Sequence, residues 1–326
     1  MPICEIDPWR MQYFSHVPCP QHVRIPTEDS DAWTWYPKHR WVYDKLAVAL
    51  SQGLAAGPHG TTPAGFPVFS KPIINLRGMG MGSSAISDAR DYEQRHQPGH
   101  FWMPMLTGRH VSTDVAVVDG TPVWWRHATG VPATEGMFAH WTIHAASDPG
   151  IETSCGAWLS RHLADYTGLI NIETIGGTII ELHLRFADQW PDLYGDGWVE
   201  AVVALYTHGR WKFGDRGRQD GYSLALFGPS VQPTDRPYRH PPPRLVEAAA
   251  SIAGVTSVQI TFHEDKPAAQ HAMPPGGFRL ALINGTDFDG ANGARELLRQ
   301  HFLGRAPAVN LRPDLWAEQS PRRGVR

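Results

Sequence analysis

The sequence predicts an α+β protein built from several lobes, with one β-hairpin at its centre. Residues 167–185 contain two β-branched, apolar runs on either side of Gly176-Gly177, the pattern of a hairpin with a two-residue turn. A Pro241-Pro242-Pro243 run marks a boundary, and helix, strand, strand and helix patterns follow it. With 326 residues the chain is long enough for two or three lobes.

Composition indicates a globular protein and excludes several classes. Hydrophobic residues make up 42% of the chain and charged residues 19%, and the formal net charge is −3, so nucleic acid is not the expected partner. The 3 cysteines are scattered and form no disulfide framework. There is no signal-peptide pattern, and no apolar run reaches the roughly 18 residues of a membrane-spanning helix. We therefore expect a soluble, cytoplasmic protein without membrane partners.

The central hairpin carries an unusual set of charges for an apolar segment. Glu181, His183 and Arg185 recur at every second residue, so they point to one face of the strand. With Gly176-Gly177 as the turn, Glu173 should lie across from Ile180 and beside Glu181. Two converging carboxylates suit Mg²⁺, which binds through one or two carboxylates plus substrate phosphates. The alternative is a solvated hairpin face with an incidental charge pattern.

The N-terminal part is predicted from weaker signals. Residues 1–40 are rich in Pro, Trp and Tyr and suggest an irregular arm or a reduced lobe. Their cysteines and histidines (Cys4, His16, Cys19, His22) fit no standard zinc spacing. Residues 41–57 predict a helix with Asp44-Lys45 at its start, and residues 66–74 predict a strand that contains Lys71.

Between this strand and the central hairpin, the chain predicts a loop, short elements and a second hairpin. Glycines at every second position of residues 77–85 would let backbone N–H groups approach a phosphate. Residues 88–97 are compatible with a helix, and residues 101–106 are apolar. Residues 109–126 predict a hairpin with Asp119-Gly120 at the turn. We expect residues 130–150 to form a loop or lid and residues 157–166 a helix.

The C-terminal half follows the central hairpin with simpler patterns. Residues 188–197 predict a loop and residues 198–206 a helix, and residues 211–243 predict an irregular Pro- and Gly-rich connector. Residues 244–310 should form a small α+β lobe with helices at 244–253 and 291–302 and strands at 257–262 and 278–283. Residues 311–326 form a polar tail.

The order of these elements resembles the ATP-grasp superfamily, and most closely its branch of biotin carboxylases and carboxylase-like enzymes of purine biosynthesis. The match covers residues 41–206, within a predicted core of 41–210, and is weaker over 220–303. It implies two α+β lobes that clasp a nucleotide, with a small C-terminal α+β lobe. Members of the superfamily usually carry a Rossmann-like lobe before the first lysine, and the 40 residues here are too few for one. The arm or another subunit would then supply that part of the site.

The resemblance also implies roles for individual residues. Lys45 and Lys71 match lysines that contact nucleotide phosphates, and His110 matches a histidine near the nucleotide. The glutamate that follows this histidine in biotin carboxylases is Ser112 here. The residues that match the phosphate loop and the adenine hinge are Gly78, Gly80, Gly82 and Ser83, and Met103, Met105 and Leu106.

The acidic hairpin matches the metal site of the superfamily. Glu173 and Glu181 correspond to its two metal carboxylates, and Arg185 to the arginine that meets the acyl phosphate or the acceptor. His183 replaces the usual asparagine, so it could tune the metal, contact a phosphate or mark lost activity. Arg126 is a further candidate for steadying charge on the transferred phosphoryl group.

The implied activity is an ATP- and Mg²⁺-dependent ligase. Such an enzyme activates a small-molecule carboxylate as an acyl phosphate, which an amine or similar nucleophile attacks. Two alternatives stay open: an ATP-grasp kinase-type phosphotransferase, and a catalytically silent nucleotide-binding or scaffold protein. The substrates and the oligomeric state are not specified by the sequence.

Overall fold

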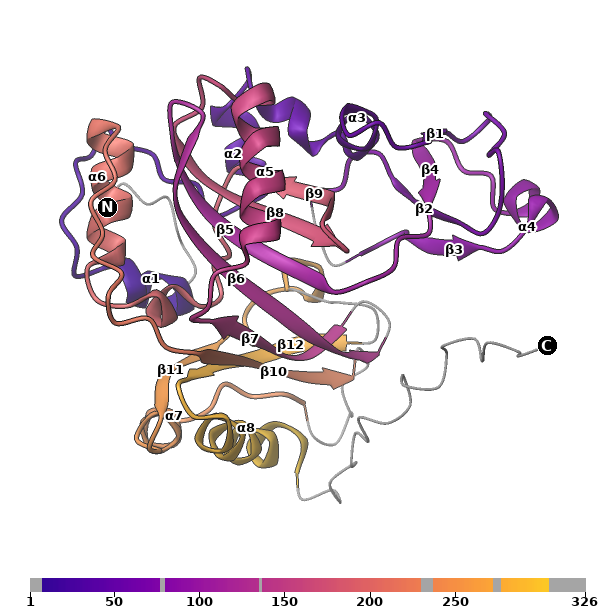
Figure 1. Cartoon of the computed structure of the whole chain (residues 1–326). Helices are drawn as coiled ribbons and strands as arrows, with labels where there is room; N and C mark the ends of the chain where they lie inside the picture. Colours follow the sequence, from indigo (N-terminus) through magenta and orange to yellow (C-terminus); the bar gives the residue numbers. More distant parts are fainter. Residues whose placement is uncertain (1–7, 77–79, 135–136, 230–236, 272–276, 305–326) are drawn as a thin grey trace, which may run out of the picture.

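The computed structural model describes residues 8–76, 80–134, 137–229, 237–271 and 277–304, which form two antiparallel sheets with helices around them (Figure 1). A 4-stranded sheet has the order β1-β4-β2-β3. Its strands are β1 (Gly57–Pro58), β2 (Val68–Pro72), β3 (Ser84–Ile86) and β4 (His100–Pro104). Together with helix α4 (Ala89–Gln94), this sheet forms a small lobe at one end of the molecule.

An 8-stranded sheet, ordered β11-β12-β10-β7-β6-β5-β8-β9, runs through the rest of the molecule. Its strands are β5 (His110–Val118), β6 (Thr121–Thr134), β7 (Met137–His144), β8 (Gly168–Ile175), β9 (Thr178–His183), β10 (Gly221–Pro229), β11 (Val255–Ile260) and β12 (Gly277–Gly285). Two predictions were wrong here. Residues 130–150 form much of a long hairpin rather than a lid, and the connector over 211–243 contains β10, which joins β7 to β12.

Alternating residues of β5 and β8 give the large sheet two different faces. Val115 and Ile172 point to one face, where they pack with Leu159 of helix α5 (Pro149–His162). Ala116 and Leu169 point to the other face, which helix α6 (Trp198–His208) and the N-terminal arm cover. The face that carries Ala116 also carries Ser112 and Asp114, because side chains two residues apart share a face.

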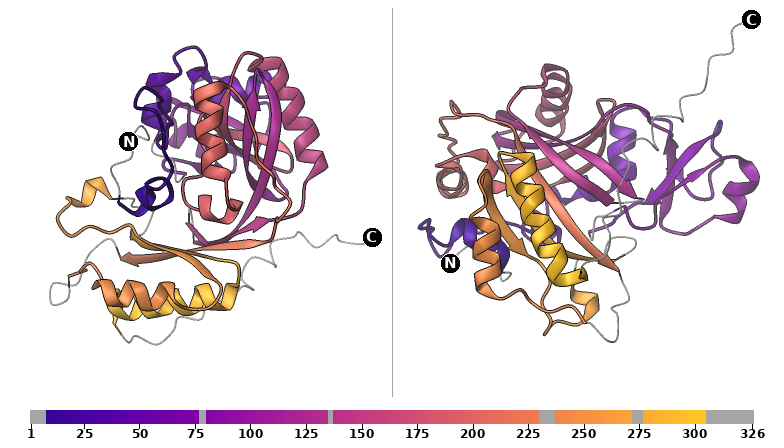
Figure 2. Two further views of the ribbon diagram at one scale, coloured as in Figure 1. Left: turned by 90° about the vertical axis from the view of Figure 1, so that its left-hand side faces the viewer. Right: turned by 90° about the horizontal axis from the view of Figure 1, so that it is seen from below.

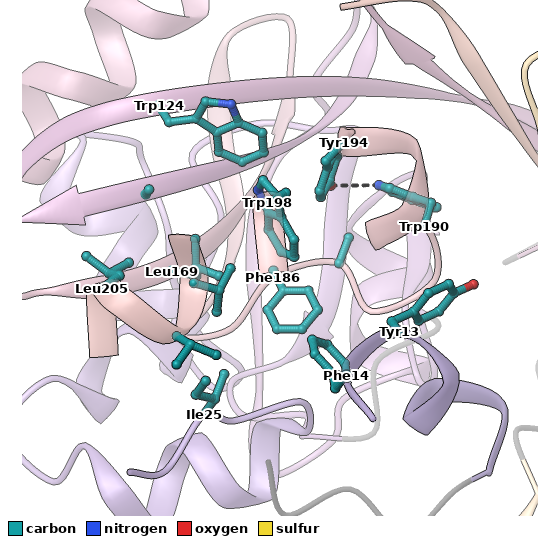
Figure 3. Close-up of a cluster of buried hydrophobic side chains, with 14 of the residues drawn as sticks. Tyr13, Phe14, Ile25, Trp124, Leu169, Phe186, Trp190, Tyr194, Trp198 and Leu205 are labelled. Carbon is teal, nitrogen blue, oxygen red and sulfur yellow. Dashed lines mark hydrogen bonds between the residues drawn. The ribbon is translucent and has the colours of Figure 1, made fainter. Parts of the chain in front are cut away.

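The N-terminal arm packs as part of the core. Helix α1 (Pro8–Phe14) places Phe14 against Phe186, with 5.9 Å between ring centroids (Figure 3). Figure 3 shows Tyr13 and Phe14 beside Phe186 and Trp198, below Trp124 of β6. The second arm helix, α2 (Asp29–Trp35), buries Ala32 and Asp29. The arm therefore fills a face of the large sheet with aromatic side chains.

The remaining helices connect or cover the sheets. The short helices are η1 (Arg40–Tyr43), η2 (Pro191–Tyr194) and η3 (Ala268–Gln270), and helix α3 (Lys45–Ser51) follows η1. Helices α7 (Pro243–Ala250) and α8 (Phe288–Leu303) lie along one face of β10, β11 and β12 (Figure 2). Over the described residues, none of the helices has both the length and the apolar character needed to cross a bilayer.

The central hairpin turns at Gly176-Gly177 as predicted, and both glycines have positive φ, +57° and +84°. A Cβ atom on Gly176 would lie 2.4 Å from the Thr107 carbonyl oxygen, whereas one on Gly177 would meet nothing within 4 Å. We expect Gly177→Ala to cost about 1–2 kcal/mol from backbone strain alone. Gly176→Ala should cost about 1–3 kcal/mol more because of the added clash. Urea unfolding of both variants tests this, and equal losses would contradict it.

Candidate nucleotide and metal site

The predicted site residues meet where the small lobe contacts the edge of the large sheet. Phe101 and Met103 of β4 and Ala49 of α3 form a buried cluster, against which Ile180 of β9 packs. This cluster brings α3 and β2 next to the β8–β9 hairpin. Lysines from one side of the junction can therefore face carboxylates from the other.

A β-bulge places the two predicted metal carboxylates side by side. Thr174 pairs with Ile179, but the register then shifts, so Glu173 pairs with Glu181 rather than with Ile180. The prediction that Glu173 faces Ile180 was wrong because a bulge adds one residue to β9. Their side chains are 26% and 16% exposed, so both carboxylates can be reached from outside the core.

The two predicted phosphate lysines converge on this hairpin. Lys45 is the first residue of α3, which Asp44 caps by accepting a hydrogen bond from the Ala47 amide. Its Nζ lies 2.6 Å from Glu181 Oε1. Lys71 of β2 donates a 2.8 Å hydrogen bond to the carbonyl oxygen of Ile180, the residue at the bulge. Burial and repulsion from Lys45 lower the pKa of Lys71 to about 8.

His110 joins the same group through Glu173. Its Nε2 lies 3.1 Å from Glu173 Oε2. Burial lowers the pKa of His110, but the contact with Glu173 outweighs burial, so the pKa lies above its ordinary value. Burial likewise raises the pKa of Glu173, but His110, His183 and Lys45 together bring it to about 2. Glu173 is therefore a carboxylate at neutral pH, as a magnesium ligand must be.

Asp29, from the N-terminal arm, occupies the other side of the acidic hairpin. Its carboxylate lies 2.9 Å from His183 Nδ1 and 2.9 Å from Arg185 Nε, and it accepts 3.0 Å and 3.1 Å hydrogen bonds from Arg185 Nη2 and the Tyr43 hydroxyl. Burial raises the pKa of Asp29, but Arg185 and His183 hold it well below its usual range. His183 Nε2 in turn lies 3.7 Å from Glu181 Oε1. Asp29 thus fixes the positions of His183 and Arg185.

No local pattern in the sequence indicated that Asp29 or Tyr43 would belong to this site. Asp29 lies in a polar run, Thr27-Glu28-Asp29-Ser30-Asp31, with no strand or motif around it. Its contact with His183 spans 154 residues. The one available hint was that a buried His183 and Arg185 require an anionic partner.

A second buried carboxylate, Asp114 of β5, lies next to this group on the sheet. It accepts hydrogen bonds from Asn171 Nδ2 (2.7 Å), the Ala187 amide (2.9 Å) and the Tyr194 hydroxyl (2.6 Å). Burial raises the pKa of Asp114 to about 6 despite these donors. Asn171 Nδ2 also donates to Ser112 Oγ, 2.9 Å away, so Ser112 belongs to this polar cluster.

The pKa of Asp114 predicts a pH dependence of stability. Because the folded state holds this proton up to about pH 6 and the unfolded chain releases it near pH 3.8, the stabilisation is complete below pH 3.8 and is lost as pH rises to 6. The loss should reach about 3 kcal/mol. The test is urea unfolding of wild type and Asp114→Asn at several pH values. The deficit of the variant should shrink as pH rises from 4 to 7, and a constant deficit would contradict this.

The other predicted nucleotide contacts are placed as follows. Met103 is buried in β4, Met105 is 40% exposed after it, and Leu106 packs against the Phe101 cluster. Gly80 and Gly82 have positive φ, and the Gly82 carbonyl oxygen lies 3.1 Å from His100 Nε2. Ser83 immediately precedes β3, and Gly78 lies outside the described residues. The roles of these residues in nucleotide binding stay predictions.

Arg126 does not join the group. The register aligns Arg126 with Asp114, Asp114 with Asn171, and Asn171 with His183, so Arg126 lies three strand spacings from His183, about 14 Å. Its Nη2 instead donates to the carbonyl oxygens of Leu193 and Gln219. This placement does not favour the predicted contact with a transferred phosphoryl group.

The donors fit a magnesium ion shared with phosphates better than a metal held by protein alone. Within the described ranges, no group of three or more His, Cys, Asp and Glu side chains is arranged to hold a metal ion. Glu173 and Glu181 pair across the hairpin, and His110 and Lys45 lie close to them. Mg²⁺ typically binds through one or two carboxylates plus substrate phosphates, which matches this pair. Of the N-terminal Cys and His residues, Cys4 lies outside the described residues.

Comparisons with known proteins give structural matches alone. No protein-family model matches the chain, and no curated protein matches its sequence. The chain is similar to a carboxyaminoimidazole ribonucleotide synthase from Aspergillus clavatus complexed with ATP, with a TM-score of 0.55 and 12% identity over 82% of this chain and 75% of that one. An L-amino acid ligase from Bacillus licheniformis matches with a TM-score of 0.51 and 12% identity over 78% and 68%.

A third solved structure, a biotin carboxylase from Campylobacter jejuni, matches with a TM-score of 0.50 and 12% identity over 84% of this chain and 72% of that one. At these identities the likeness establishes the fold. The predicted fold class is confirmed, because all three proteins are ATP-grasp enzymes of the carboxylase-like and ligase branches. The chain has the ATP-grasp fold.

Proposed function

We propose that this protein is an ATP- and Mg²⁺-dependent ligase that activates a carboxylate for attack by an amine or a similar nucleophile. The observation that carries the proposal is the ion pair between α3 and the acidic hairpin, where Lys45 Nζ lies 2.6 Å from Glu181 Oε1. A buried lysine that would bind the nucleotide thus lies against a carboxylate that would bind the metal. The solved structures to which the chain is similar include enzymes of this class in complex with ATP or ADP.

Lys45 and Lys71 would hold the phosphates of the nucleotide. Both are buried, with side chains that reach β9, so a bound phosphate would meet fixed positive charges rather than mobile ones. The pKa of Lys71, about 8, should rise when an anion binds, because the anion offsets the repulsion from Lys45. His110 would be released from Glu173 to contact the nucleotide.

Glu173 and Glu181 would hold magnesium. The ion would neutralise charge between the β- and γ-phosphates, as metals do in phosphoryl transfer generally. The positive side chains already beside these carboxylates, Lys45 and His110, would move to phosphate oxygens.

Arg185 and His183 would face the substrate carboxylate, with Asp29 as their internal partner. In the structure the Arg185 guanidinium contacts both Asp29 oxygens, at 2.9 Å and 3.0 Å. This contact also favours a second candidate function, a silent nucleotide-binding protein, because an arginine fully engaged by Asp29 has fewer donors left for a substrate.

An ADP-release assay against a panel of organic acids and amino acids tests the proposal. A ligase should release ADP only when both a carboxylate and a nucleophile are present, and it should form an amide-type product. A stable phosphorylated product from one substrate would indicate a kinase-type phosphotransferase instead. ATP binding without release across the panel would support the silent protein and count against the ligase.

A further inference from the structure

A cavity of about 70 Å³ lies away from the candidate site, where strand β6 meets the C-terminal strands of the large sheet. Its walls come from β6, η2, the loop before β10, β11 and the segment after β12. Its lining includes Arg126, Arg218, Asp192, Asp220, Thr256 and Thr286.

Arg126 is the unusual side chain in this cavity. The residue is 2% exposed, and its Nη2 donates to the Leu193 and Gln219 carbonyl oxygens at 3.2 Å and 2.7 Å. Its Nε and Nη1 have no hydrogen-bond partner among the residues that the structure describes. A guanidinium has five N–H donors, of which Nε and Nη1 carry three. A buried charge with most of its donors unused is costly unless a nearby anion offsets that charge.

The other charged side chains that line the cavity are already engaged in bonds within the protein. Arg218, a second cation, forms an ion pair with Asp215 and donates to the Trp125 carbonyl oxygen. Two carboxylates also line the cavity, but each is engaged. Asp192 accepts hydrogen bonds from Asn284 Nδ2 and Thr256 Oγ1, at 2.7 Å and 2.5 Å, and Asp220 accepts one from the Ala145 amide at 2.7 Å.

The titration of the lining groups agrees with this picture. Burial raises the pKa of Asp192, because the protein interior disfavours the charged form of its carboxyl. Burial lowers the pKa of Arg126, so its positive charge is held at a cost that an anion would relieve. The cavity is also far larger than the roughly 10–15 Å³ that one water molecule needs.

We propose that this cavity binds a small oxyanion, of the phosphate or carboxylate class, beside the guanidinium of Arg126, whose Nε and Nη1 donate to none of the described residues. Such an anion would join β6 to the η2 segment and to the C-terminal strands. The site is independent of the candidate nucleotide site, and it does not rest on the ligase proposal.

The first test is isothermal titration and thermal unfolding of the full chain with inorganic phosphate or with acetate, against sodium chloride at the same ionic strength. At least one of the two anions should bind wild type and raise its melting temperature. Arg126→Gln should weaken that binding by at least about tenfold, because it removes the charged donor. Lys71→Ala, in the nucleotide site, should keep the binding, which separates the two sites. Comparing phosphate with acetate shows whether the cavity prefers a phosphate or a carboxylate group.

A second pair of variants keeps the test valid if Arg126→Gln does not fold. Thr286 lines the cavity and is exposed, so Thr286→Glu can place a carboxylate beside Arg126, and Thr286→Gln is its uncharged match. Thr286→Glu should raise the melting temperature without added anion and abolish the response to anions, whereas Thr286→Gln should respond like wild type. No response of wild type to either anion, or an undiminished response of Thr286→Glu, would overturn the proposal.

Discussion

Glu173→Gln is expected to remove the magnesium dependence of ATP binding and to lower turnover by at least about a thousandfold, since metal stabilisation of phosphoryl transfer is worth several kcal/mol. The amide keeps the shape of the side chain but loses the charge that would bind the metal beside Glu181. Titration of ATP with and without Mg²⁺ measures the first effect. It needs no knowledge of the substrate.

Glu152→Gln is a matched control for this experiment. The Glu152 side chain lies 3.1 Å from His127 Nε2 and is 25% exposed. The Glu173 side chain lies equally far from His110 Nε2, 3.1 Å, and is 26% exposed. Glu152, however, belongs to α5, which covers the opposite face of the sheet. Both variants lose one His–Glu pair, but Glu173 is also stabilised by Lys45 and His183, so Glu173→Gln should lose more stability. Magnesium dependence should change in Glu173→Gln alone. An unchanged magnesium dependence there would remove Glu173 from the metal site.

Asp29→Asn should destabilise the fold by about 3–5 kcal/mol, the usual cost of removing one member of a buried ion pair. The Asp29 side chain is 4% exposed and faces the charged Arg185, which is 18% exposed, and His183, which is 5% exposed. Without the carboxylate, Arg185 and His183 both lose the partner that holds them. Urea unfolding at neutral pH measures this loss.

Asp165→Asn is the comparison for a surface pair. Asp165 is 54% exposed and pairs with Lys38, which is 71% exposed, so its loss should change the free energy of unfolding little. If Asp29→Asn were no more destabilising than Asp165→Asn, the arm would not anchor Arg185 and His183. The short N-terminal arm would then have no established part in the site.

Local signals account for what the sequence predicted correctly. Gly176-Gly177 and Asp119-Gly120 form the turns of their hairpins because these positions adopt positive φ, which glycine tolerates best. Asp44 caps α3 and sets Lys45 at its first position. Glu181 and His183, two residues apart, were correctly predicted to lie on the second strand of the central hairpin.

Non-local packing decided what the sequence could not show. Ile180, the extra residue of the bulge, packs against residues of α3 and β4, and the bulge changes which residue faces Glu173. The long β6–β7 hairpin contains Gly130 and Pro132, which read locally as a loop. Asp29 reaches His183 from 154 residues away, a distance over which no periodicity carries information.

The most direct test of the nucleotide site is isothermal titration of wild type and Lys71→Ala with ATP and Mg²⁺, with Lys38→Ala as the surface control. Lys71 is buried against β9, whereas the Lys38 side chain is 71% exposed. We expect wild type and Lys38→Ala to bind ATP equally, and Lys71→Ala to bind at least about tenfold more weakly because a charged phosphate contact is lost. No binding by wild type, or equal binding by all three proteins, would contradict the assignment of this site to a nucleotide.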